Sequence, residues 1–219
     1  NFFVAITKES HLCHVIIASS DGYFMKRIFE DSKLSKTSDF YAVDYLNESD
    51  IKYWLTHLES ESAITTLKLS DTQINLIWKY IGGSVWEVSH LLDKLSNCAK
   101  NSSISNDLLN DKIQVMINKN GARFEHYAGI CTKKLLLLKE IHHISEQKNS
   151  FKTLDLKALA DKKAYDNMTL QKELSTLVQL NYLAFNPTTS MYQLQGKSMF
   201  YGLNKFVESM PDDIFVKTD

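Results

Sequence analysis

Three polar residues, Ser19, Ser20 and Asp21, directly follow an apolar run at residues 15–18. A short run rich in β-branched residues that ends in Ser, Asp and Gly is typical of a buried strand followed by a turn. Ligands of open α/β sheets bind outside the carboxyl ends of the strands. Hydroxyls and a carboxylate at that place could hold a nucleotide phosphate or its attacking water. The alternative is that Ser20 or Asp21 caps a helix starting at Gly22, and the spacing alone favours this cap.

A glycine pair, Gly82 and Gly83, precedes an apolar-patterned segment that begins at Ser84. Glycine allows the backbone to approach a ligand closely, and the N-terminus of the following helix would face an anion. The simpler interpretation is a turn between two consecutive helices, because a left-handed residue after a helix costs glycine little. The spacing alone favours the turn.

A helical pattern that starts at Asn167 could present polar side chains to a DNA major groove. The candidate contacts are Asn167, Thr169, Gln171 and Lys172. Residues 130–210 contain eleven Lys and seven acidic residues, so their net charge is weakly positive. A dedicated DNA-binding domain is usually more basic, with its charge clustered. Binding of DNA and docking of a protein therefore both stay open for this helix.

The sequence contains no other pattern that predicts catalysis or metal binding. His11, Cys13 and His14 lack a usual zinc spacing, and no second cluster accompanies them. A catalytic triad, a paired acid and base, and the phosphate loop G-x-x-x-x-G-K-[ST] are all absent from the sequence. We assign no catalytic residue and no metal ligand, and we expect these 219 residues alone not to hydrolyse a nucleotide.

The elements that would position these residues form an α+β, mainly helical chain. The first block is expected to contain strands near residues 15–18 and 40–46, with a helix between them. Two strands cannot form a stable sheet, so further strands are expected before Asn1. The second block has helices capped at Asn47 and Ser70 and a helix that starts near Ser105, and the third has three helices and a β-hairpin. The predicted domains are residues 1–46, 47–129 and 130–210, with a tail at 211–219.

The composition predicts a cytoplasmic protein that does not enter a membrane. Apolar residues make up 44% and charged residues 23% of the chain, which is ordinary for a globular protein. No apolar run approaches the roughly 20 residues that a membrane helix needs, and no secretory signal is visible. The three cysteines have no pattern and are expected to be reduced core residues. The chain starts at Asn1 without Met, inside an apolar helical pattern, which predicts a piece of a longer protein.

The segment TKESHLCHVIIASSD at residues 7–21 resembles a strand of the archaeal-type P-loop ATPases of the STAND/AAA+ class. In that family the strand reads Thr-Lys-Glu-x-His-Leu-x-His-Val and ends in Ser-Asp. The pair Val43-Asp44 and the segment WKYIGG at residues 78–83 are similar to the family's next strand and its helical lid. Residues 1 to about 118 carry the resemblance by motif, and the remainder carries it by the order of its elements.

The resemblance implies the second half of such an ATPase: the end of an α/β core, a helical lid bundle and a winged-helix domain. Ser20 and Asp21 would end the sensor-1 strand, which faces the γ-phosphate, and the glycine pair would lie beside the adenine. The implied nucleotide-binding residues are Ser19, Ser20, Asp21, Gly82 and Gly83. ATP and Mg²⁺ are implied for the longer protein, whose phosphate loop would lie before Asn1.

The function implied is that of a switch, in which binding and hydrolysis of ATP move the winged helix. The alternative is a winged-helix module that docks DNA or protein without nucleotide chemistry. Unpaired strands would also make association with a separate N-terminal half, or self-association, plausible.

Overall fold

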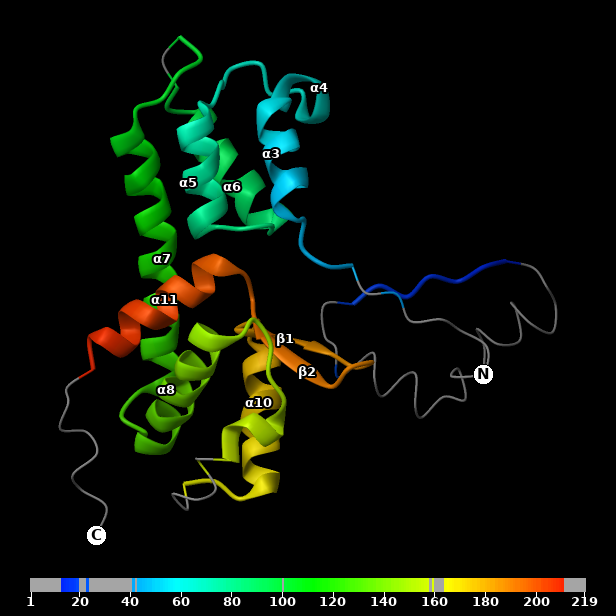
Figure 1. Ribbon diagram of the computed structural model, residues 1–219, viewed down its shortest axis with the longest axis vertical. Coiled ribbons are helices and arrows are strands. Elements are labelled where there is room, and N and C mark those ends of the chain that lie inside the picture. Colours follow the sequence, from blue (N-terminus) through cyan, green and yellow to red (C-terminus); the bar gives the residue numbers. More distant parts are fainter. Residues whose placement is uncertain are drawn as a thin grey trace. The chain divides into compact units, whose positions relative to one another are not determined.

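The computed structural model describes residues 13–19, 23, 41, 43–99, 101–157, 159 and 164–210. The chain divides into two compact units (Figure 1). The helical unit comprises residues 44–143 and 195–219, and the hairpin unit comprises residues 1–43 and 144–194. The predicted domain boundaries after residues 46, 129 and 210 stay predictions.

The helical unit is built from capped amphipathic helices. The Asn47 side chain accepts the Asp50 N–H at the start of α3, and Ser70 and Gln73 form a reciprocal capping box on α5. The helix predicted to start near Ser105 is α7, and the Ser105 side chain caps it by accepting the Leu108 N–H. The helices are α3 (Glu48–Thr56), α4 (Leu58–Ser62), α5 (Asp71–Tyr80), α6 (Val85–Ser96), α7 (Asn106–Ala128), α11 (Lys197–Glu208) and the first part of α8 (Thr132–Gln147).

One apolar core holds α3, α5, α6 and the first half of α7 together. Its members come from the apolar face of each helix, as the helical periodicity predicts. Side chains that are at most 1% exposed include Ile51, Leu55, Ile77, Ile81, Val88, Leu91, Leu92, Leu95, Leu109 and Ile113. Removal of this apolar area from water is the main stabilising contribution to the unit.

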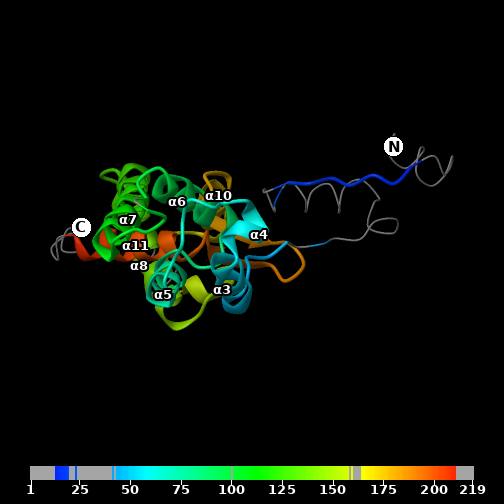
Figure 2. The same ribbon diagram turned by 90° about the horizontal axis from the view of Figure 1, so that it is seen from above.

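Helix α11 crosses the middle of α7 at close range (Figures 1 and 2). A Cβ atom on Gly202 would lie 2.6 Å from the Asn120 Cβ, so only glycine fits at this crossing. A Cβ on Gly121 would in turn lie 3.3 Å from the Gly202 carbonyl oxygen. Helix α11 itself begins at Lys197.

The hairpin unit contains α10 (Asn167–Gln179), the strands β1 (Leu183–Asn186) and β2 (Met191–Leu194), and the 3-10 helix η3 (Thr153–Leu156). The strands pair antiparallel, with Leu183 opposite Leu194, which confirms the predicted hairpin. Phe151 forms an isolated bridge with Tyr192 beside it. The fold is therefore α+β and mainly helical, as predicted.

The strands predicted in the first block are wrong where the structure describes them. Residues 13–19 and 43–46 lie outside regular structure, and the Ile16 and Val43 side chains are 93% and 89% exposed. A strand needs a neighbour for its backbone hydrogen bonds, and within the described residues only β1 and β2 pair in a sheet. Local apolar patterning cannot supply that neighbour. Of the helix expected after Gly22, only Tyr23 is described, and it is helical.

The expectation for the cysteines is also wrong. Cys13, Cys98 and Cys131 are free thiols, but all three are exposed rather than in the core. Each lies at or beyond the end of a predicted or observed element, where burial is not required. No described helix combines the length and the apolar character that crossing a bilayer requires.

Candidate functional site

The glycine corner, residues 81–84, joins α5 to α6. Ile81 ends α5, and Gly82 follows with φ of +75°, the left-handed conformation expected after a helix. The Ser84 hydroxyl then caps α6 by accepting the Glu87 N–H. The predicted turn between two helices is confirmed.

The glycine corner is fastened to the segment that precedes α3. The Leu46 N–H donates to the Gly83 carbonyl oxygen at 3.0 Å. A Cβ on Gly83 would lie 1.8 Å from the Leu46 carbonyl oxygen, so the two backbones approach as closely as only glycine permits. The fold therefore requires glycine at both positions, because Gly82 makes a left-handed turn and Gly83 makes a close backbone contact.

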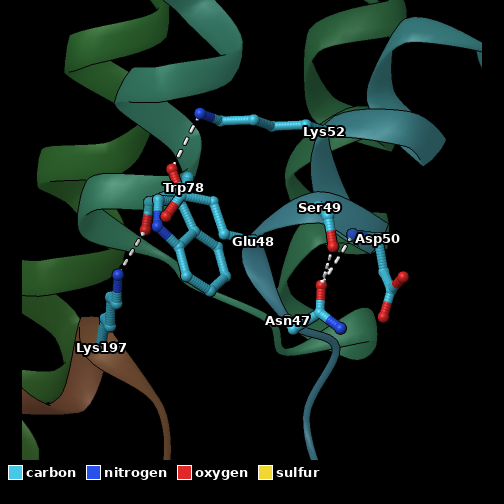
Figure 3. A network of polar contacts seen from close by, with 7 residues as sticks. All are labelled: Asn47, Glu48, Ser49, Asp50, Lys52, Trp78 and Lys197. Atoms are coloured by element: carbon cyan, nitrogen blue, oxygen red, sulfur yellow. Dashed lines mark hydrogen bonds and ion pairs between the residues drawn. The ribbon is translucent and has the colours of Figure 1, made fainter.

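Lys197, the first residue of α11, brings a cation against the corner (Figure 3). Its Nζ donates to the Trp78 carbonyl oxygen at 3.2 Å and lies 3.9 Å from the centroid of the indole ring. Its Cγ would be 3.0 Å from a Cβ on Gly82. Burial lowers the pKa of Lys197, and the carboxylate of Glu48 opposes that shift. Sequence reasoning missed this residue, which lies 119 positions from Trp78.

Glu48 is held on the other side of Trp78 by Lys52. Lys52 Nζ lies 2.8 Å from the Glu48 carboxylate, one helical turn away on α3 (Figure 3). This interaction is the main reason that the pKa of Glu48 is lowered. The ion pair is exposed, so its contribution to stability is small.

A network of hydrogen-bonded polar side chains connects α6 to α7 through α11. The Ser198 hydroxyl donates to Glu87 Oε1, and Asn120 Nδ2 donates to the Ser198 oxygen at 2.9 Å. Arg123 donates to Asn120 Oδ1 at 3.4 Å. Glu87 Oε2 is buried and has no hydrogen-bond partner among the described residues. Burial raises the pKa of Glu87, while the hydrogen bond from Ser198 and the charge of Arg123 lower it.

Tyr45 contacts the segment that precedes α11. Its hydroxyl donates to Gln195 Oε1 at 2.6 Å. Burial, and secondarily the charge of Glu87, raises the pKa of Tyr45 to about 12. The hydroxyl therefore keeps its proton at neutral pH and remains a donor.

The other predicted nucleotide contacts belong to the other unit of the chain or lie outside the described residues. Ser19 is exposed, lies outside regular structure and belongs to the hairpin unit. Ser20 and Asp21 lie outside the described residues. Gly82 and Gly83 are buried and adjacent in the helical unit.

The four candidate DNA contacts lie on α10, as predicted. Asn167, Gln171 and Lys172 are exposed, whereas Thr169 is half-buried. The N–H and the hydroxyl of Thr169 donate to the capping Asp166 at 2.8 and 2.7 Å, so this side chain serves the helix start. Gln171 and Lys172 line a hollow of about 430 Å³, together with Tyr23, Thr153, Met168, Phe185, Ser190 and Tyr192.

The part of the chain that the structure describes contains no set of side chains that could bind a metal ion. No three His, Cys, Asp or Glu side chains gather there in a way that could hold an ion. Of the predicted weak metal candidates, His11 lies outside the described residues, and Cys13 and His14 are exposed.

Comparison with known proteins gives matches from archaea. Residues 1–91 match a family described as an ATPase domain predominantly from Archaea. A protein of Methanocaldococcus jannaschii, named an uncharacterized ATP-binding protein, is 35% identical over 114 residues, which are 52% of this chain and 29% of that protein. Another from the same organism, with the same description, is 30% identical over 113 residues, 52% of this chain and 30% of its own.

A further relative comes from Pyrococcus abyssi and is also named an uncharacterized ATP-binding protein. It is 37% identical over 86 residues, which are 38% of this chain and 22% of that protein. The chain thus spans less than a third of the length of these relatives. No solved structure matches significantly. Over residues 1–91 the chain is thus similar to an archaeal ATPase domain, and the relatives that it matches are named as ATP-binding proteins.

Proposed function

We propose that the chain is the C-terminal part of an ATP-binding switch ATPase, with the glycine corner against the nucleotide and residues 130–210 as a winged helix. The observation that carries the proposal is the extent of the family match. It covers residues 1–91, which contain both predicted nucleotide segments, residues 19–21 and 82–83. The relatives named as ATP-binding proteins support the same ligand.

The described residues offer a nucleotide little at the corner. The space that a Cβ would take at Gly82 and Gly83 is filled by the Lys197 side chain and the Leu46 backbone. The Lys197 ammonium is already engaged by Trp78. The phosphates and Mg²⁺ would depend on a phosphate loop, which this sequence does not contain, and on carboxylates beside it. ATP would then be held chiefly by other parts of the longer protein.

The order of elements supports a winged helix for residues 130–210. Helix α8, the bridge at Phe151, the 3-10 helix η3, α10 and the β1–β2 hairpin follow one another as in that fold. In such a domain α10 would be the recognition helix and the hairpin the wing. A nucleotide that contacts two conformations differently would shift the domain between two positions.

A polypeptide of these 219 residues is expected to bind Mg-ATP with a dissociation constant of about 1 mM or weaker. The physical reason is that the phosphate loop supplies most contacts to ATP and is absent from this sequence. Isothermal titration calorimetry measures the affinity, and a longer protein that includes a phosphate loop should bind far more tightly. Submicromolar binding by the 219 residues would contradict the proposal.

The second candidate is a DNA-docking or protein-docking module, favoured by the exposed polar face of α10. Duplex DNA should bind with a steep salt dependence if Lys172 contacts phosphate, and Lys172→Ala should reduce the logarithmic slope by about 1. Fluorescence anisotropy over a salt series measures this. Lys148→Ala is the matched control, because Lys148 is paired with Asp155 at 2.8 Å. If the unsubstituted chain and Lys172→Ala both bind DNA weakly and with little salt dependence, docking of a protein is favoured.

A further inference from the structure

The chain crosses into the helical unit near residues 44 and 195, and these two crossings are tied together. The tie is the hydrogen bond from the Tyr45 hydroxyl to Gln195 Oε1, at 2.6 Å. The two residues are 150 positions apart in sequence, and each follows its crossing directly. The bond therefore joins two segments that lie far apart in the sequence.

Both crossings are also fastened to the glycine corner. The first is held by the hydrogen bond from the Leu46 N–H to the Gly83 carbonyl oxygen. The second is held through Lys197, whose Cγ packs against Gly82 and whose Nζ bonds Trp78. A shift of the corner would thus act on the two crossings at once.

In the second crossing, the backbone at Gly196 lies close to the start of α6 and the end of α5. Gly196 has φ of +85°, and a Cβ there would lie 3.2 Å from Glu87 Oε2 and 3.9 Å from the Ile81 carbonyl oxygen. Ser198 on α11, two residues further on, donates to Glu87 Oε1. The crossing is therefore packed against the start of α6 as well as against the end of α5.

We propose that Tyr45 and Gln195 are positioning residues that clasp the two crossings, so that the glycine corner cannot move without residues 195–197 moving with it. Residue 195 directly follows β2, so the clasp connects the corner to the segment that continues from the hairpin. The inference rests on the proposed function, because it supplies the regulation of the same nucleotide corner. The clasp itself is defined by the geometry above.

The measurement must distinguish coupling between the two crossings from a change in the stability of either segment alone. The Tyr45 side chain is 41% exposed, so losing its hydrogen bond should change global stability little. Exchange of the Leu46 amide reports on the first crossing, since this amide donates to Gly83. The Phe200 amide donates to the Gly196 carbonyl oxygen at 3.4 Å and reports on the second crossing.

Amide hydrogen exchange of the 219-residue chain tests the clasp with Tyr45→Phe, Gln195→Met and the double variant. Gln195→Met should speed exchange of the Leu46 amide about fivefold, and Tyr45→Phe should do the same for Phe200, because each change releases the opposite crossing. The double variant should match the single variants, since all three lack the same bond.

The matched control is Tyr53→Phe, which removes an exposed hydroxyl that donates to Glu61 at 3.4 Å. It should change neither amide. The clasp is overturned if each variant affects only its own crossing, or if the two effects add. If the exchange results hold while a longer protein with a phosphate loop fails to bind ATP, the clasp stands and the proposed function fails.

Discussion

Gly83→Ala is expected to lower the free energy of unfolding of the helical unit by at least about 3 kcal/mol. The added Cβ would lie 1.8 Å from the Leu46 carbonyl oxygen and 2.8 Å from its carbon. Both are backbone atoms, which cannot rotate away as a flexible side chain can. Either the corner or the segment before α3 must move, and the Leu46–Gly83 hydrogen bond is lost with that movement. Urea unfolding followed by tryptophan fluorescence measures the change, because Trp54, Trp78 and Trp86 all belong to the helical unit.

Gly129→Ala is the matched control for this substitution. Gly129, unlike Gly83, has a positive φ, of +49°, and a Cβ there would meet no atom within 4 Å. The control should therefore cost only the backbone strain of an alanine, about 1 kcal/mol. If Gly83→Ala destabilises the unit no more than Gly129→Ala does, the backbones of Leu46 and Gly83 do not approach as closely as described.

The requirement at Gly83 separates two roles that one residue can have. The fold of the helical unit demands glycine there whether or not a nucleotide binds. A loss of ATP binding in a Gly83 variant would therefore not by itself identify a contact. Variants of Tyr45 and Gln195 leave the glycines intact, and they are better suited to testing how the corner works.

Glu87→Gln is expected to stabilise the helical unit at neutral pH by about 1–3 kcal/mol. Burial raises the pKa of Glu87 above its ordinary value of 4.5, so the folded chain holds this proton more tightly than the unfolded chain. The associated stability is present at pH below 4.5 and is lost as pH rises through the folded-state pKa. The glutamine removes the charge, keeps an acceptor for Ser198, and should abolish that loss.

The measurement is the difference in urea unfolding free energy between variant and wild type from pH 4 to pH 8. The difference should be small at the acidic end and should grow in favour of the variant as pH rises. Glu59→Gln, at an exposed position on α4, should show no such growth. A variant that is less stable than the wild type at pH 8 would mean that Arg123 and Ser198 stabilise the carboxylate more than burial disfavours it.

Elements whose signals lie within a few residues were predicted correctly. The capping box at Ser70 and Gln73, the cap at Asn47 and the left-handed Gly82 each depend on residues at most a few positions apart. The hairpin followed from two short apolar runs around the turn-rich loop that the sequence predicts at residues 186–190. Helices and tight turns satisfy their hydrogen bonds internally, so their local sequence is sufficient.

The strands expected at residues 15–18 and 40–46 failed for the opposite reason. A strand is satisfied only by a neighbouring strand, and the apolar pattern that suggests one says nothing about whether the neighbour is present. The exposed cysteines show the same limit, since residue type alone does not determine burial.

The sequence by itself determined the mainly helical α+β class, the caps and the glycine turn, and the resemblance of its first part to archaeal ATPases. Only the tertiary structure brought Lys197 onto Trp78, Ser198 onto Glu87 and Tyr45 onto Gln195, across 119, 111 and 150 positions. No periodicity or motif links residues at such separations. They meet because α11 returns to cross α7 through the contact at Gly202, and that crossing depends on the packing of the whole unit.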